Sequence, residues 1–241
     1  MVERQTASGL ARATAVLGGV AFFLSLIYFL HAYLGRFGRV TAPDATSTAW
    51  AVGVNVALFA VFALHHSAFA RLGLKRRITD LVSPAFERSV YVWASSALFF
   101  VVCALWRPVP GVAWSITPPV SLGFLATEML GAILAVYAAT RLDVLDLAGV
   151  RQALAVGPAP AGTVLRQGPY GWVRHPVYLG WVLLVWATPV MTGTRLVFAA
   201  ASTIYVVAAI PLEERDLARA FGPAYADYRR VVRWRLVPFL F

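Results

Sequence analysis

Long apolar runs alternate with short, mostly basic segments along this chain. Four of the runs cover residues 13–34, 49–70, 90–106 and 120–140. A helix needs about 20 mainly apolar residues to cross a bilayer, so each run predicts a membrane-spanning helix. The first run holds no Asp, Glu, Lys or Arg and is longer than the apolar core of a secretory signal peptide. The pattern therefore predicts a protein that crosses the membrane several times.

Two shorter apolar runs, at 177–190 and 196–212, are joined by a turn at Thr192-Gly193. They predict a helical hairpin. Each arm is short for a full crossing, so either both arms cross with charged flanks at the interface, or the first arm only re-enters. With both arms crossing, the fold class is an all-α, polytopic integral membrane bundle of about six transmembrane helices.

The tail that follows Leu212 has a different pattern. Helical spacing continues to Phe221, and Gly222-Pro223 then ends that helix and opens a short new one. The tail is expected to form cytoplasmic helices. One interpretation is an amphipathic helix at the membrane surface, held by anionic lipid, which leaves its other face open for a site. The basic residues of that helix and the segment after it are Arg229, Arg230, Arg233 and Arg235.

Composition agrees with a membrane protein. Of the 241 residues, 60% are hydrophobic and only 13% are charged. A disordered chain needs low hydrophobicity, and a soluble enzyme needs more polar surface than this chain offers. Cys103 is the single cysteine, which excludes a disulfide framework or a cysteine-based metal site within the chain.

The net charge of +10 has a clear topological pattern. With six crossings, 17 of the 21 basic residues fall on the side that holds both termini, and 4 fall on the other side. Basic loops mark the cytoplasmic side, so both termini are expected in the cytoplasm, with the protein in the inner membrane of a bacterial cell. The same sorting removes nucleic acid as the explanation of the charge.

Polar groups gather at both ends of the predicted hairpin. Arg174, His175 and Tyr178 stand at its start, and Glu213 and Glu214 stand at its end. A hairpin brings these ends together, and charges beside an apolar wall need a partner or a ligand. A plain structural latch between Arg174 and one of the glutamates is the alternative.

The segment Gly168–Gly180 resembles the G-x-Y-x-x-V-R-H-P-x-Y-x-G pattern of integral membrane methyltransferases, a superfamily that includes isoprenylcysteine carboxyl and phospholipid N-methyltransferases. A pair of glutamates and F-G-x-x-Y-x-x-Y follow one hairpin later, so the resemblance covers about 165–232. It implies a cytoplasm-facing site for the cofactor S-adenosylmethionine. The cofactor-binding residues implied are Tyr170, Arg174, His175, Pro176, Tyr178, Gly180, Glu213, Glu214, Tyr225 and Tyr228. The proline that often follows the valine after the tyrosines is absent, because Val232 precedes Arg233.

The middle of the chain carries a second series: His65-His66-Ser67, then Glu87-Arg88-Ser89, then Trp106-Arg107-Pro108. With the residues after 181, it is similar to the bacterial methanethiol S-methyltransferases, which extends the resemblance over most of 60–232. It implies an acceptor side at 1–140, a methyltransferase region at 141–241, and dimethyl sulfide as product. A small thiol and the lipid bilayer are then the expected partners, and the oligomeric state is left open.

The chemistry of a thiol acceptor suggests catalytic candidates. A thiol is mostly protonated near neutral pH, and the thiolate is the nucleophile. His65 or His66 is a candidate base, and Arg71 or Arg88 is a candidate source of positive potential. The catalytic candidates are therefore His66, His65, Glu87 and Arg88, with Glu87 as a neighbour of the histidines. A polar histidine pair at the membrane interface is the alternative. Adjacent histidines point to different helix faces and make a poor metal pair, so no metal is expected.

Other functions remain open at this stage. A related membrane methyltransferase would act on a lipid, an amine or an isoprenylcysteine carboxyl. A non-enzymatic membrane protein linked to denitrification is the alternative of another class. A transporter is disfavoured, because neither internal repeats nor paired broken helices are evident.

Overall fold

The computed structural model describes residues 9–42, 47–69, 84–142 and 164–241. Its helices are α1 (Gly9–His31), α2 (Thr48–Phe69), α4 (Pro84–Leu105), α5 (Val120–Arg141), α8 (Pro176–Trp186), α9 (Gly193–Phe221) and α10 (Pro223–Val231), with a π-helical turn η1 (Ala32–Arg36) and a 3₁₀ turn η2 (Gly168–Gly171). Strands β1 (Val112–Ser115) and β2 (Val190–Thr192) pair antiparallel.

Five helices in the described residues are long and apolar enough to cross a membrane: α1 with η1, α2, α4, α5 and α9. The four long runs predicted from sequence are confirmed as helices. The second arm of the hairpin is confirmed to continue as a helix to Phe221, before Gly222-Pro223. The predicted fold class, an all-α polytopic membrane bundle, is confirmed. The first arm of the hairpin is the shortest of the apolar helices, at 11 residues.

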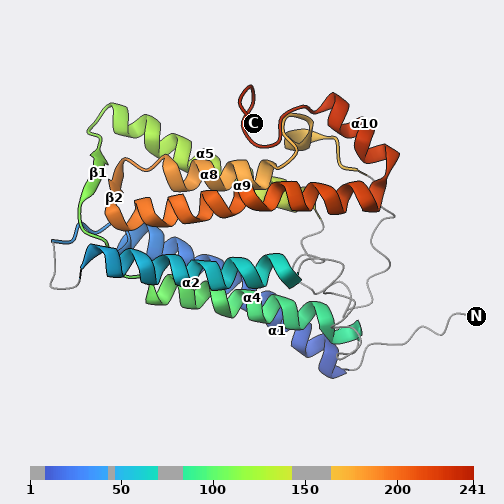
Figure 1. Ribbon diagram of the computed structural model, residues 1–241, viewed down its shortest axis with the longest axis horizontal. Helices are drawn as coiled ribbons and strands as arrows, with labels where there is room; N and C mark the ends of the chain where they lie inside the picture. Colours follow the sequence, from blue (N-terminus) through green and yellow to red (C-terminus); the bar gives the residue numbers. More distant parts are fainter. Residues whose placement is uncertain (1–8, 43–46, 70–83, 143–163) are drawn as a thin grey trace, which may run out of the picture.

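The short first arm, together with the residues that follow it, nevertheless runs along α9 from Glu213 back to Gly193. Its start, at Tyr178, contacts Glu213 of α9, and its far end, at Thr192, adjoins the first residue of α9. From Gly193 to Glu213 the α9 backbone rises about 30 Å at 1.5 Å per residue. Helix α8 covers about half of that height, and the non-helical residues 187–192 cover the rest. Figure 1 shows α8 and the segment up to β2 running alongside α9.

The passes form two layers. In Figure 1, α1, α2 and α4 make one layer, and α5, α8 and α9 make the other, with the start of α1 and α10 at the same end. The division of the chain into an acceptor side at 1–140 and a methyltransferase region at 141–241 stays a prediction. Helix α5, which ends at this boundary, packs along α8 and so lies in the layer of the C-terminal hairpin.

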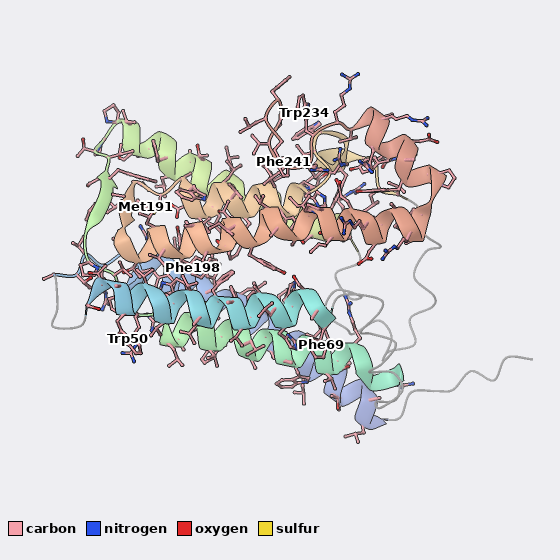
Figure 2. The ribbon with its side chains drawn as sticks, in the orientation of Figure 1. Trp50, Phe69, Met191, Phe198, Trp234 and Phe241 are labelled. Carbon is pink, nitrogen blue, oxygen red and sulfur yellow. The ribbon has the colours of Figure 1, made fainter. Side chains whose placement is uncertain are left out.

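Aromatic side chains fill the space between the layers. The Phe198 ring, on α9, lies between the layers in Figure 2 and contacts rings of the other layer, including Phe29 and Phe59. Trp181 of α8 stacks on Phe29 with ring centroids 4.8 Å apart. Large aromatic surfaces contribute most to such a core, because each ring removes a large apolar area from solvent.

Two glycines allow α5 and α8 to approach closely. A Cβ atom added to Gly180 would lie 2.5 Å from the Ala135 backbone nitrogen, and one added to Gly131 would lie 2.6 Å from the Leu184 backbone nitrogen. Close backbone contact through small residues is the usual way for membrane helices to pack tightly. The start of α8, which carries Tyr178, is thereby fixed against α5.

The opposite end of the bundle is held by a buried arginine. Arg195 donates hydrogen bonds to the carbonyls of Tyr33, Leu34 and Val190 and to the Thr188 hydroxyl. Its side chain is 8% exposed. These acceptors belong to both layers, so the arginine connects the end of α1 to the hairpin turn.

Candidate functional site

The candidate site lies at the open end of the hairpin, where α8 begins and α9 leaves the bundle. Pro176 is the first residue of α8, a position where the missing N–H of proline costs no helical hydrogen bond. Arg174 and His175 therefore stand just outside the helix, and both are buried. The predicted convergence of these residues with Glu213 and Glu214 is present in the structure.

The chain before α8 is paired with the C-terminal tail. The backbone N–H groups of Arg174 and His175 donate to the carbonyls of Trp234 and Arg235, each at 2.9 Å. The Arg174 guanidinium adds bonds from Nη1 to the carbonyls of Val232, at 2.8 Å, and Arg233, at 2.7 Å. The tail after α10 thus forms one wall of the site, although it stands about 60 residues away in sequence.

Glu214 is the centre of the charge network. Its Oε1 accepts from Arg174 Nε at 2.6 Å, and its Oε2 lies 3.2 Å from Arg235 Nε. The carboxylate is 4% exposed. A buried carboxylate between two guanidinium groups is compensated, whereas either charge alone would be costly in this position. The latch interpretation is therefore correct for Arg174 and Glu214.

Glu213 has a more open position. Its side chain is 44% exposed, and its Oε2 accepts from the Tyr178 hydroxyl at 2.8 Å. The His175 ring stacks on Tyr178 with centroids 5.5 Å apart and places Nδ1 3.7 Å from Glu213 Oε2. Glu213 thus faces solvent beside a stacked pair of rings.

Two tyrosines of α10 and Tyr170 of η2 pack together at the site. The Tyr228 hydroxyl donates to the Tyr170 carbonyl at 2.7 Å, and the Tyr225 and Tyr228 rings lie 5.9 Å apart. Burial raises the pKa of Tyr228 to about 12 and also raises the pKa of Tyr170 and Tyr225. All three hydroxyls are therefore neutral donors at physiological pH.

Two buried polar atoms at the site have no hydrogen-bond partner among the described residues: His175 Nε2 and the Tyr225 hydroxyl. The nearest acid to His175 Nε2 is Glu214 Oε1, 3.5 Å away and outside hydrogen-bond geometry. Buried polar groups are normally satisfied, so these atoms are available to a ligand. A cavity of about 270 Å³ opens at Glu214, lined by Pro211, Glu214, Arg215, Ala218, Arg229 and Arg235.

The remaining predicted cofactor-binding residues have structural positions. Pro176 begins α8, and Gly180 faces α5 at the close helix crossing. Contact of either with a cofactor stays a prediction. In the structure their evident effect is to position Tyr178, which lies between them.

The predicted catalytic residues lie in the other layer, opposite α9. His66 Nδ1 lies 3.0 Å from the Tyr91 hydroxyl, and its ring contacts Tyr205 of α9, with centroids 6.3 Å apart. His65 instead stacks on Phe69 and Tyr91. His66 is thus the histidine that faces the hairpin.

The two charged candidates differ. The Arg88 guanidinium lies 5.6 Å from the centre of the Tyr91 ring, so Arg88 belongs to the same cluster. Glu87 lies in α4, and its side chain is outside the described residues. Catalysis by any of these groups stays a prediction.

Sequence reasoning missed Tyr205, Ser67 and Arg235 as members of these clusters. The Ser67 hydroxyl donates to the Tyr205 hydroxyl at 3.4 Å, across the two layers. The available signal was Tyr205 itself, a polar aromatic residue two helical turns before Glu213 inside an apolar run.

Comparison with known proteins decides the family. Methanethiol S-methyltransferase of Mycobacterium tuberculosis is 37% identical over 91% of this chain and 93% of its own. The corresponding enzyme 2 of Bradyrhizobium diazoefficiens is 36% identical over 94% of this chain and 89% of its own. The Crocosphaera subtropica enzyme is 35% identical over 100% of this chain and 98% of its own. The chain belongs to the methanethiol S-methyltransferase family.

A second comparison agrees. The model of the isoprenylcysteine carboxyl methyltransferase (ICMT) family matches residues 127–219, from within α5 to the end of α9. The matched segment is the layer that carries the candidate site. No solved structure matches the chain significantly. The resemblance inferred from sequence is confirmed, and this is an integral membrane protein of a methyltransferase family.

Proposed function

We propose that this chain transfers a methyl group from S-adenosylmethionine to methanethiol and releases dimethyl sulfide. The observation that carries the proposal is the site at the hairpin mouth, where buried polar atoms without partners adjoin a half-exposed carboxylate and stacked rings. The relatives named above act on methanethiol by their names. The same activity in this chain is the proposal.

The residues present fit S-adenosylmethionine, which supplies an electrophilic methyl group when bound. Glu213 is half-exposed and suits an ammonium group or ribose hydroxyls, whereas Glu214 is already held by two arginines. His175 Nε2 and the Tyr225 hydroxyl are the unpartnered groups that would bind the cofactor. Three bonds from Arg174 to protein acceptors make it a positioning residue for Glu214 and the tail.

The acceptor thiol is proposed to bind between the layers, beside His66, Tyr91 and Tyr205. With a proton on Nδ1 donated to the Tyr91 oxygen, His66 has a free lone pair on Nε2. That atom takes the thiol proton and leaves the thiolate that accepts the methyl group. The apolar rings around the cluster exclude water, and a small apolar thiol reaches them from the bilayer.

The proposed location follows the charge pattern. The start of α1 and α10 lie at the same end of the bundle in Figure 1, and the six-pass topology places 17 of the 21 basic residues on that side. We infer that this end faces the cytoplasm, where the water-soluble cofactor is made, and that the membrane is the inner membrane of a bacterial cell.

Binding and headspace measurements test the proposal. Purified protein in detergent should bind S-adenosylmethionine, and Glu213→Gln should weaken binding while Asp216→Asn, three residues along α9, should not. Cells fed methanethiol should release more dimethyl sulfide with the protein than without it. The proposal would be contradicted if neither the parent protein nor its variants bound S-adenosylmethionine. It would also be contradicted if cells released equal amounts of dimethyl sulfide with and without the protein.

The role of His66 has its own test. Thiolate is scarce at low pH, so His66→Ala should reduce turnover more at pH 6.5 than at pH 9, and His65→Ala serves as the matched control because its ring faces away from α9. Equal loss at both pH values would assign His66 a structural role.

A further inference from the structure

A second and larger cavity lies beside the tail, with a volume of about 640 Å³. Five arginines line it together with apolar groups and no acidic residue among the described ones: Arg174, Ala226, Arg229, Arg230, Arg233, Trp234, Arg235 and Phe241. This size is typical of sites for small organic molecules. The cavity has one dominant property, which is positive charge.

Only part of this charge is compensated by described residues. Glu214 neutralises part of the charge of Arg174 and Arg235, and Asp227 pairs with Arg230 at 3.0 Å on the exposed face of α10. Arg229 and Arg233 have no acidic partner among the described residues. Guanidinium groups are frequent protein donors to phosphate.

This charge is unfavourable for the cofactor of the proposed reaction. S-adenosylmethionine carries a sulfonium and an ammonium against one carboxylate, so its net charge is positive at neutral pH. A cavity that several arginines line repels such a ligand and attracts an anion. The larger cavity therefore favours an anion over the cofactor, even though it shares Arg229 and Arg235 with the smaller cavity.

The chain around the cavity is oriented toward the bilayer. After α10 the tail turns back, and Leu236 packs on Val206 and Ile210 within the membrane-crossing part of α9. Phe239 and Leu240, next in the turn, are 87% and 82% exposed. Figure 2 shows Trp234 and Phe241 together on the outer side of α8 and α9, beside α10. Exposed apolar side chains beside a membrane-crossing helix favour contact with lipid chains over contact with water.

We propose that the larger cavity binds the phosphodiester headgroup of an anionic phospholipid, with its acyl chains along the exposed apolar turn. Arginine donors around the cavity and apolar residues at membrane depth are the two features that such a lipid requires. The proposal is independent of the methyltransferase reaction, because the residues that line only this cavity are outside the proposed cofactor and acceptor contacts.

The test measures lipid binding to the purified full chain by native mass spectrometry. The probes are dioleoylphosphatidylglycerol and dioleoylphosphatidylcholine, which share acyl chains and differ in headgroup charge. The variant is Arg230→Gln with Arg233→Gln, because both side chains line the larger cavity and not the smaller one. The matched control is Arg219→Gln with Arg141→Gln, since Arg219 has the same (i, i+3) pairing with an aspartate as Arg230.

We expect about tenfold preference for phosphatidylglycerol in the parent protein and in the control, and less than about twofold in the variant, because each lost guanidinium removes charge-assisted bonds to phosphate. Equal binding of both lipids, or an unchanged preference in the variant, would overturn the proposal. Displacement of the lipid by millimolar inorganic phosphate would overturn the assignment of a lipid to the cavity and would indicate a soluble anion as its ligand. Loss of S-adenosylmethionine binding in the variant would instead assign the cavity to the cofactor.

Discussion

The glycine crossing between α5 and α8 offers the sharpest test of how the fold positions the site. In Gly180→Ala, the new Cβ would lie 2.5 Å from the Ala135 nitrogen, 2.6 Å from the Gly131 oxygen and 2.9 Å from the Ala135 Cα, all of them backbone atoms. Ordinary contact begins at 3.4 Å, so the two helices must separate by about 0.9 Å, the difference between 3.4 and 2.5 Å. Overpacking of this kind costs about 1–3 kcal/mol of stability.

The separation also moves the site. Tyr178 lies two residues before Gly180 on α8, and its hydroxyl bonds Glu213 of α9 at 2.8 Å. A displacement near 1 Å at a reacting centre can reduce a rate by about 100-fold. We expect Gly180→Ala to lower the midpoint of thermal unfolding in detergent and to reduce methyl transfer from labelled S-adenosylmethionine by at least tenfold.

Two companion variants make this reasoning refutable. Gly123→Ala, also on α5, meets no atom within 4 Å and should leave stability and turnover unchanged. Ala135→Gly should not rescue Gly180→Ala, because the crowded atoms of Ala135 are its backbone nitrogen and Cα. Normal stability and turnover in Gly180→Ala, or rescue by Ala135→Gly, would show that the crossing is not limited by backbone contact.

The other predictions concern the charges and hydroxyls that hold the site. Glu214→Gln leaves the buried Arg174 without its carboxylate and should cost about 3–5 kcal/mol in chemical denaturation, whereas Glu213→Gln, at a half-exposed position, should cost less than about 1 kcal/mol. Arg195→Gln removes a side chain that makes four hydrogen bonds at the opposite end of the bundle; it should destabilise the protein by about 3 kcal/mol, while the fraction that stays folded keeps its cofactor affinity. Tyr228→Phe loses the bond to the Tyr170 carbonyl and should cost about 1 kcal/mol at pH 8. Because burial raises the pKa of Tyr228 from 10 to about 12, the parent protein loses stability between pH 10 and 12. The difference in free energy of unfolding between the parent and Tyr228→Phe should therefore become smaller over that range.

Much of the architecture could be predicted from hydrophobic length alone. A helix in lipid must satisfy its own backbone, so the long apolar runs allow no structure other than spans. The same argument was weaker for α8, whose 11 helical residues are followed by an extended segment that pairs with β1. Pairing between 112–115 and 190–192 depends on where two distant loops meet, and no local pattern in the sequence encodes that.

The site shows a similar division. Arg174, His175, Tyr178, Glu213 and Glu214 were identified because a hairpin joins its own ends. The tail was harder, since its contacts with Arg174 use the backbone carbonyls of residues 232 and 233, which every residue type offers. Backbone acceptors leave no trace in the sequence. The contact of His66 with Tyr205 likewise depends on how the two layers pack. The spacing of apolar residues along each helix does not specify that packing.

Arg195 has a consequence for the biogenesis of the protein. Its acceptors at Tyr33 and Leu34 belong to the first segment synthesised, and the guanidinium itself arrives with the last transmembrane helix. A charged side chain enters the bilayer at a much lower cost when its acceptors are already in place. The N-terminal layer is thus expected to act as an intramolecular template for the insertion of α9. In a nascent chain truncated before residue 193, the carbonyls of Tyr33 and Leu34 would lack the hydrogen bonds that Arg195 donates. Insertion of α9 would supply these bonds and complete the bundle.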